Sequence, residues 1–181
     1  MLFRSGATTS AGLEAGLPGG TLHFYKLNAY HNRYIPITRD FVFRGNAEIG
    51  YGHGYDGKPL PFFRNYYLGG PGNLRGFYPG NVGPKDINNT PTGGSRKLLV
   101  NAELLFPFPG LPNDKSVRVA TFADAGIIGE SYTVGDVRTS VGFSVSYVSP
   151  FGPLKISFAQ PIKSQIGDVK QKIQFQFGQQ F

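Results

Sequence analysis

The last residues of the chain alternate between apolar and polar side chains. One parity holds Ile173, Phe175, Phe177 and Phe181, and the other holds Lys172, Gln174, Gln176, Gly178 and Gln180. Successive side chains of a β-strand point to opposite faces, so a period of two predicts a strand with one apolar and one polar face. The alternation runs over about ten residues, the length that a tilted strand needs to cross a membrane.

The same alternation recurs along the rest of the chain. It is found at 7–17, 22–35, 41–51, 98–106, 117–125, 137–147 and 154–158. The polar parity mostly carries Ser, Gly, Asn and Gln, whereas the other parity is aliphatic or aromatic. Membrane barrels place polar residues in the lumen and apolar residues against lipid. The sequence therefore predicts an all-β fold, an antiparallel transmembrane outer-membrane β-barrel with about eight strands present.

Composition favours a lipid-facing surface over a water-facing one. Charged residues make up 16% of the 181 residues, against about 25% in soluble domains. No stretch approaches the ~18 apolar residues of a spanning helix. A soluble β-barrel or sandwich that binds an apolar ligand remains an alternative, although its outer face would carry more Lys and Glu. Solubility without detergent would favour that alternative.

Several other functional classes lack support. The net charge is +7, but the Lys and Arg residues are scattered singly, so no nucleic-acid partner is expected and anionic lipid fits better. His23, His31 and His53 are dispersed without metal-ligand spacing, and no Gly-x-Ser-x-Gly elbow occurs. The chain is therefore expected to have no catalytic residues, no metal and no cofactor.

One long connection separates the predicted strands, at about 56–96. Long connections in compact domains are uncommon and usually functional. Glycines crowd its centre, from Gly69-Gly70 to Gly76, and they permit a tightly folded tip. Within this tip the motif Leu74-Arg75-Gly76-Phe77 carries one charge, on Arg75.

This motif resembles the Val-Arg-Gly-Phe/Tyr signature of the outer-membrane barrel insertases and their secretion relatives. The flanking Gly69-Gly70, the later Ser149-Pro150-Phe151-Gly152-Pro153 turn and the terminal aromatic strand match the same family in the same order. The resemblance covers nearly the whole chain. It implies that residues 1–181 form a single C-terminal barrel segment, with an extracellular loop at about 56–96 and no periplasmic POTRA domains.

The resemblance also implies a contact inside the barrel. In that family the loop arginine folds back to meet acidic lumen residues, and the matching positions here are Arg75 with Glu103 and Asp124. The alternation agrees, because both carboxylates lie on the polar parity of strands that follow the loop. A charge-assisted arginine–carboxylate contact in a lumen is stronger than an exposed pair. We therefore expect this contact to pin the loop.

The resemblance assigns the last strand to a seam. In the family, a strand like Ile173–Phe181 meets the first strand of the barrel at a weak junction, and Gly178 matches a glycine near it. The family's first strand has no counterpart here, and no signal peptide follows Met1-Leu2-Phe3-Arg4. The chain is therefore expected to be a fragment whose open strand edges allow self-association.

The function that the resemblance implies belongs to the parent protein. It is the folding and insertion of β-barrel proteins into the bacterial outer membrane, with outer-membrane lipid, assembly-complex lipoproteins and nascent outer-membrane proteins as partners. A sibling barrel remains open as an alternative, either of the translocation module or of the two-partner secretion transporters. Upstream POTRA repeats or a plug helix would separate these siblings.

Overall fold

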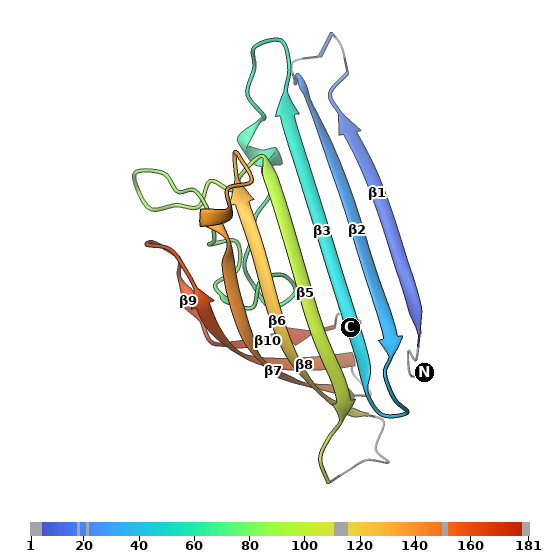
Figure 1. Cartoon of the computed structure of the whole chain (residues 1–181). Helices are drawn as coiled ribbons and strands as arrows, with labels where there is room; N and C mark the ends of the chain where they lie inside the picture. Colours follow the sequence, from blue (N-terminus) through green and yellow to red (C-terminus); the bar gives the residue numbers. More distant parts are fainter. Residues whose placement is uncertain (1–4, 18, 21, 111–115, 150–151, 179–181) are drawn as a thin grey trace.

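The alternating segments form the strands of one antiparallel sheet. The computed structural model describes residues 5–17, 19–20, 22–110, 116–149 and 152–178. Eight strands follow one another in chain order across the sheet: β1 (Gly6–Ala15), β2 (Phe24–Pro36), β3 (Val42–Gly54), β5 (Arg96–Pro107), β6 (Val117–Gly129), β7 (Arg138–Ser149), β8 (Gly152–Lys163) and β10 (Ile173–Phe177). This confirms the predicted all-β antiparallel fold. The sheet curves from β1 to β10 (Figure 1).

The two edges of the sheet are β1 and β10. Within the described residues, each pairs with one neighbour, β1 with β2 and β10 with β8, and they do not pair with each other. Among these same residues, no helix is both long and apolar enough to cross a membrane.

The polarity of the sheet is the reverse of that in a soluble protein. Side chains of the polar parity are buried on the concave face, among them Asn101, Asp124, Ser144, Ser157 and Gln174. Large apolar side chains of the other parity are exposed on the convex face, among them Leu27, Ile49, Val141, Phe143, Phe158 and Phe175. An apolar convex face and a polar concave face are what a barrel wall in lipid requires.

The connections differ between the two rims. At one rim the chain passes from β1 to β2, from β3 to β5, from β6 to β7 and from β8 to β10, whereas at the other it passes from β2 to β3, from β5 to β6 and from β7 to β8. Two short 3-10 helices, η1 (Phe62–Arg64) and η2 (Val134–Asp136), lie on the first rim. The long connection between β3 and β5 is the predicted loop. It folds back along the concave face beside β5 and β6 (Figure 1).

This loop supplies the hydrophobic core. The buried cluster consists of Tyr66, Leu68, Leu74, Phe77 and Val82 from the loop, with Leu99 of β5 and Ile128 of β6. The water-excluded core therefore lies inside the curve of the sheet, between the loop and strands β5 and β6. The loop also contributes β4 (Gly76–Phe77), which pairs with β9 (Lys170–Gln171), just before the last strand.

Most strand boundaries differ from those predicted by a few residues, and β8 differs most. The strand predicted at 154–158 extends over β8, Gly152–Lys163. Pro161 lies in this strand where the β7–β8 register shifts between Thr139 and Ser140, so its missing N–H is tolerated. The described part of the last strand ends at Phe177, and Phe181 lies outside the described residues.

Candidate functional site

The long loop places Arg75 against the concave face of the wall. The backbone N–H of Gly70 donates to the carbonyl oxygens of Leu74 and Phe77, at 3.1 Å each, which closes the glycine-rich tip. Leu74 and Phe77 are fully buried on either side of the arginine. These two apolar side chains anchor the loop, and the Arg75 side chain between them is 3% exposed.

Arg75 binds Asp124 of β6 in a two-pronged contact. Its Nε donates to Oδ2 at 2.7 Å and its Nη2 donates to Oδ1 at 2.6 Å. The backbone N–H of Arg75 adds a longer bond to Oδ2, at 3.2 Å. This fork geometry gives both strength and orientation, because the planar guanidinium matches the two carboxylate oxygens.

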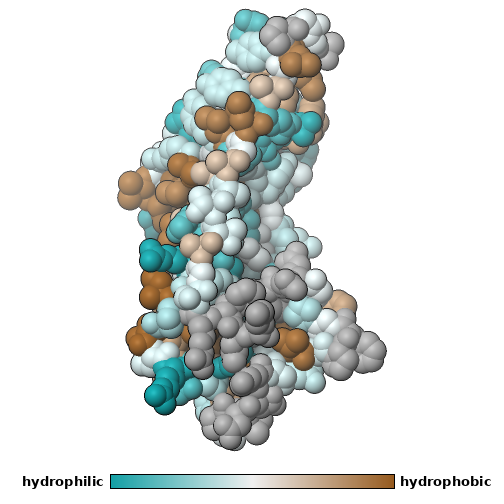
Figure 2. All heavy atoms as spheres, turned by 90° about the vertical axis from the view of Figure 1, so that its right-hand side faces the viewer, coloured by the Kyte–Doolittle hydropathy of each residue, from teal (hydrophilic) through white to brown (hydrophobic). Residues whose placement is uncertain are grey.

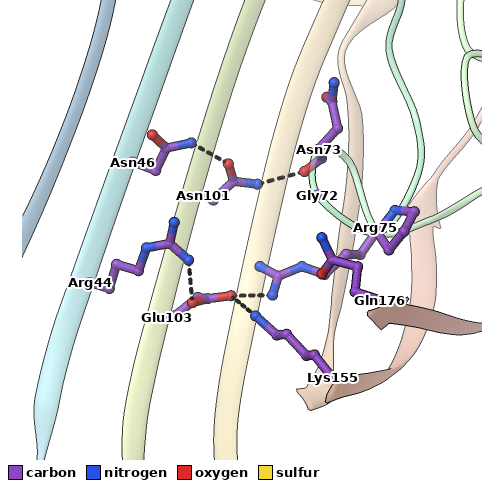
Figure 3. A pocket seen from close by; sticks show the side chains of 10 residues that line it. Arg44, Asn46, Gly72, Asn73, Arg75, Asn101, Glu103, Lys155 and Gln176 are labelled. Atoms are coloured by element: carbon purple, nitrogen blue, oxygen red, sulfur yellow. Dashed lines mark hydrogen bonds and ion pairs between the residues drawn. The ribbon is translucent and has the colours of Figure 1, made fainter. Parts of the chain in front are cut away.

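A second carboxylate, that of Glu103 on β5, forms ion pairs with three cationic side chains. Its side chain is 4% exposed and accepts hydrogen bonds from Arg75 Nη1, from Arg44 Nη1 at 3.1 Å and from Lys155 Nζ at 3.2 Å. These cations come from the loop, from β3 and from β8 (Figure 3). Burying this carboxylate without its cationic partners would be costly, so the three contacts stabilise one another.

Two further residues complete the surroundings of Arg75. The Phe122 ring lies beneath the guanidinium, 3.5 Å from its centre, in a cation–π contact. Asn101 donates to Asp124 Oδ1 and to the Asn73 carbonyl oxygen, both at 2.9 Å. Burial alone would lower the pKa of Arg75, but the hydrogen bonds of Asp124 and the charge of Glu103 raise it above its usual value. The arginine therefore stays charged.

A small polar cavity of about 110 Å³ lies beside this cluster. It is lined by side chains of the loop and of four strands, which Figure 3 shows converging from both sides: Arg44, Asn46, Arg75, Asn101, Glu103, Lys155 and Gln176. A space of this size and polarity suits ordered water better than an apolar ligand. Among the described residues, no group of three or more His, Cys, Asp or Glu could hold a metal.

The structure thus brings together the residues that the sequence singled out in the loop and the wall. Arg75 meets Glu103 and Asp124, and Leu74, Gly76 and Phe77 pack around it. The sequence did not identify Arg44 or Lys155 as further partners of Glu103. Their polar-face parity was a signal. The register that sets Arg44 directly opposite Glu103 on the neighbouring strand, and the curve that brings Lys155 of β8 to it, could not be read from that parity. The functional role of this contact stays a prediction.

The predicted seam residues lie at the far edge of the sheet. Ile173, Phe175 and Phe177 point outward from β10 with exposures of 49%, 70% and 63%. Gly178 has a φ of +76°, a backbone conformation that favours glycine and ends the strand. Their role at a seam stays a prediction.

Known proteins share both the sequence pattern and the architecture. A family profile described as the Omp85 superfamily domain matches residues 2–181. The outer membrane protein assembly factor BamA of Neisseria meningitidis is 35% identical, over 97% of this chain and 26% of its own length. A SAM50-like protein of Schizosaccharomyces pombe is 29% identical, over 92% of this chain and 38% of its own.

A solved structure has the same arrangement of strands. The crystal structure of BamA from Haemophilus ducreyi lacking POTRA domains 1-3 superposes with a TM-score of 0.89 at 29% identity. The match covers 95% of this chain and 38% of that one. The eight described strands therefore correspond to part of a larger barrel, and the chain spans about a quarter of the Neisseria relative.

Proposed function

This chain belongs to the Omp85 superfamily, and on that basis we propose that it is the C-terminal barrel segment of a protein assembly factor. The parent protein would fold other β-barrel proteins and insert them into the bacterial outer membrane. One observation carries the proposal. The sheet has an apolar convex face and a polar concave face, and on the concave face Arg75 of the loop binds Asp124 and Glu103. The relatives named as assembly factors support a role in assembly and not in catalysis.

An outer-membrane location accords with the names of the relatives and with the convex face. The aliphatic and aromatic side chains of that face would contact outer-membrane lipid. Relatives occur in bacteria and in eukaryotes, and the bacterial outer membrane is our proposal because the BamA matches are bacterial. The loop at about 56–96 and the other long connections would lie on the extracellular side.

The partners of the parent protein would be assembly-complex lipoproteins and nascent outer-membrane proteins. The open edges support a role in strand pairing. Within the described part of the sheet, β10 pairs with β8 and β1 pairs with β2, so each of the two has one side at which another strand could pair. An added strand gains main-chain hydrogen bonds at such an edge. In the isolated segment the same edges would promote self-association.

Reconstitution would test this function. The parent protein, placed in liposomes, is given an unfolded outer-membrane barrel protein, and folding is followed by the mobility of unheated samples on a gel. We expect folding to be faster than in liposomes without the protein, and slower again with Arg75→Ala. Equal rates with and without the protein would contradict the proposal.

A second measurement separates the proposed activity from that of the sibling barrels. A translocation-module barrel or a two-partner secretion transporter would move a soluble passenger across the bilayer without inserting a barrel. Passenger protected from external protease inside the liposomes, with no inserted barrel, would favour a sibling.

A further inference from the structure

The loop that carries Leu74-Arg75-Gly76-Phe77, here called the motif loop, contacts the concave face of the sheet at two separate places. Arg75 binds the central strands β5 and β6, and the next residues, Gly76 and Phe77, lie against the last strands. An added Cβ at Gly76 would lie 3.2 Å from the Cβ of Ala159 and 3.2 Å from the ring of Pro161, both on β8. With a φ of +87° as well, only glycine allows this close approach. The three residues 75–77 therefore bridge the concave face from its centre to its C-terminal edge.

The side-chain amide of Gln174, on β10, hydrogen-bonds to the backbone of the segment 75–77. Its Oε1 accepts the backbone N–H of Gly76 at 3.2 Å, and its Nε2 donates to the carbonyl oxygen of Phe77 at 2.7 Å. An amide that bonds the N–H of one residue and the C=O of the next replaces the pairing that a neighbouring strand would provide. The Gln174 side chain is 1% exposed, so these bonds are shielded from water.

The segment before β10 is tied to the same part of the loop. β4 and β9 pair through Gly76 with Gln171 and Phe77 with Lys170. The Tyr78 N–H donates to the Val169 carbonyl oxygen at 2.8 Å. The Val169 N–H in turn donates to Asn81 Oδ1, at 2.9 Å. Loop and last strand thus share a continuous set of hydrogen bonds.

The last strand needs such support because its own pairing is short. β10 pairs with β8 from Ile173 to Phe177, whereas β7 and β8 pair from Thr139 to Ser149. A short strand at a sheet edge opens more readily than a central strand. Its apolar side chains point outward, whereas Gln174 and Gln176 face the concave side, and Gln174 is the more deeply buried of the two.

We propose that Gln174 is a positioning residue that couples the docked motif loop to the edge strand β10. When Arg75 is docked on Asp124 and Glu103, the two hydrogen bonds of Gln174 hold β10 in register with β8, and β10 then presents its outer edge to a further strand. When the loop undocks, these two bonds are lost and β10 separates from β8. The consequence for barrel assembly rests on the proposed function, but the coupling itself does not.

Amide hydrogen exchange in the protein reconstituted in lipid bilayers tests the coupling. Gln174→Leu removes both hydrogen bonds at similar volume. Gln174→Glu keeps the acceptor for Gly76 but sets a carboxylate against the Phe77 carbonyl oxygen. We expect exchange about ten-fold faster at Gly76 and along 173–177 in both variants, as the loss of buried hydrogen bonds implies, with β5 and β6 still protected. Gln160 is an exposed glutamine on the outer face of β8, so Gln160→Leu is the matched control and should change none of these rates.

A double variant separates coupling from a local packing role. Arg75→Ala should also speed exchange along 173–177. In the Gln174→Leu variant it should add little, because the hydrogen bonds between Gln174 and the loop are already absent. Unchanged exchange in both Gln174 variants, or fully additive effects of Arg75→Ala, would overturn the proposal. If Gln174→Leu does not fold, Gln174→Asn, which keeps a shorter amide, takes its place. The exchange is measured without substrate, so a failure of the assembly test leaves this result interpretable, and the converse also holds.

Discussion

The strands β1 and β5 belong to one sheet and share one alternation, yet their concave faces differ completely. On β5, Lys97, Leu99, Asn101 and Glu103 are all buried. On β1, every described residue but Glu14 is exposed. The loop between β3 and β5 explains the difference, because its glycine-rich tip covers the concave face beside β5 and β6 (Figure 1), whereas it reaches β1 through the Arg64–Glu14 ion pair. Alternation decides which face a side chain points to, and the loop decides whether that face is buried.

The space-filling view shows the side of the molecule that carries β1. Among the residues coloured by hydropathy, apolar and polar ones interleave on this side (Figure 2). An apolar groove on the convex face of β1, β2 and β3 is lined by Ala11, Leu13, Leu27, Ala29 and Ile49. On this side lipid, and not the loop, would complete the surroundings of the strands.

The largest effect is expected where the loop meets the wall. Arg75→Ala leaves Asp124 and Glu103 without their shared cation in a buried site, which should lower the free energy of unfolding by about 3–5 kcal/mol. The measurement is the guanidinium midpoint of the folded band on unheated gels of the protein in detergent. Arg75→Lys keeps the positive charge but cannot make the two-pronged contact with Asp124, so its midpoint should lie between those of the unchanged protein and of Arg75→Ala. A midpoint unchanged by Arg75→Ala would mean that the contact does not pin the loop.

The same substitution in the two regions should differ next. Leu74→Ala, in the core under the loop, removes a fully buried side chain and leaves a cavity, at a cost of about 2–5 kcal/mol. Leu13→Ala, on the convex face of β1, removes a side chain that is 70% exposed in the protein, and lipid or detergent fills the space. Its cost should be about 1–2 kcal/mol, without a cavity contribution. Equal losses on the same gel assay would contradict the burial that the loop is said to create.

Two ion pairs extend the comparison to electrostatics. Glu48 accepts from Lys97 of β5, whose side chain is 7% exposed, at 2.8 Å. Glu14 of β1 accepts from the half-exposed Arg64 at 3.0 Å. Glu48→Gln should cost about 1.5 kcal/mol, because the charged donor is buried although the Glu48 side chain is 34% exposed. Glu14→Gln should cost about 0–1 kcal/mol and less in high salt, since an exposed pair is screened. A salt-independent loss at Glu14 would be the wrong outcome.

The smallest effect is a pH dependence confined to alkaline solution. Tyr66 of the loop donates to the Leu27 carbonyl oxygen and to Asn28 Oδ1, and burial raises the pKa of its hydroxyl to about 12. The unfolded chain loses this proton near pH 10, earlier than the folded one, so the stabilisation is complete below about pH 10 and falls as the pH rises to about 12. Tyr66→Phe should remove this part of the pH dependence in guanidinium titrations. The same slope in Tyr66→Phe would assign it to another group.

Much of the wall could be predicted from the sequence because a strand has a period of two. The strands and their two faces follow from local alternation, as at Phe175 against Gln174. The extent of β8 could not be predicted, since Pro161 is compatible with a strand only at the register shift opposite Thr139 and Ser140. Such a shift depends on the partner strand and leaves no local signal.

The candidate site was predictable in part for the same reason. The resemblance pointed to Arg75, Glu103 and Asp124, which the fold brings together. The contribution of Lys155 was missed because β8 follows Glu103 by a long stretch of chain, and the two meet only through the curve of the sheet. The grip of Gln174 on Gly76 was missed as well, because on β10 it looked like any other polar-face residue.

The amino-acid sequence by itself determined the all-β architecture, the two faces of the wall and the single charge, Arg75, in the glycine-rich tip of the loop. Those properties depend on neighbours in the chain, through strand alternation and glycine conformation. The tertiary structure alone decided that the polar face is the buried one at β5 and the open one at β1. It also decided that residues 75–77 connect the central strands to β10. Both depend on where a long loop comes to rest, and that is settled by the summed burial and charge pairing of residues far apart in the chain.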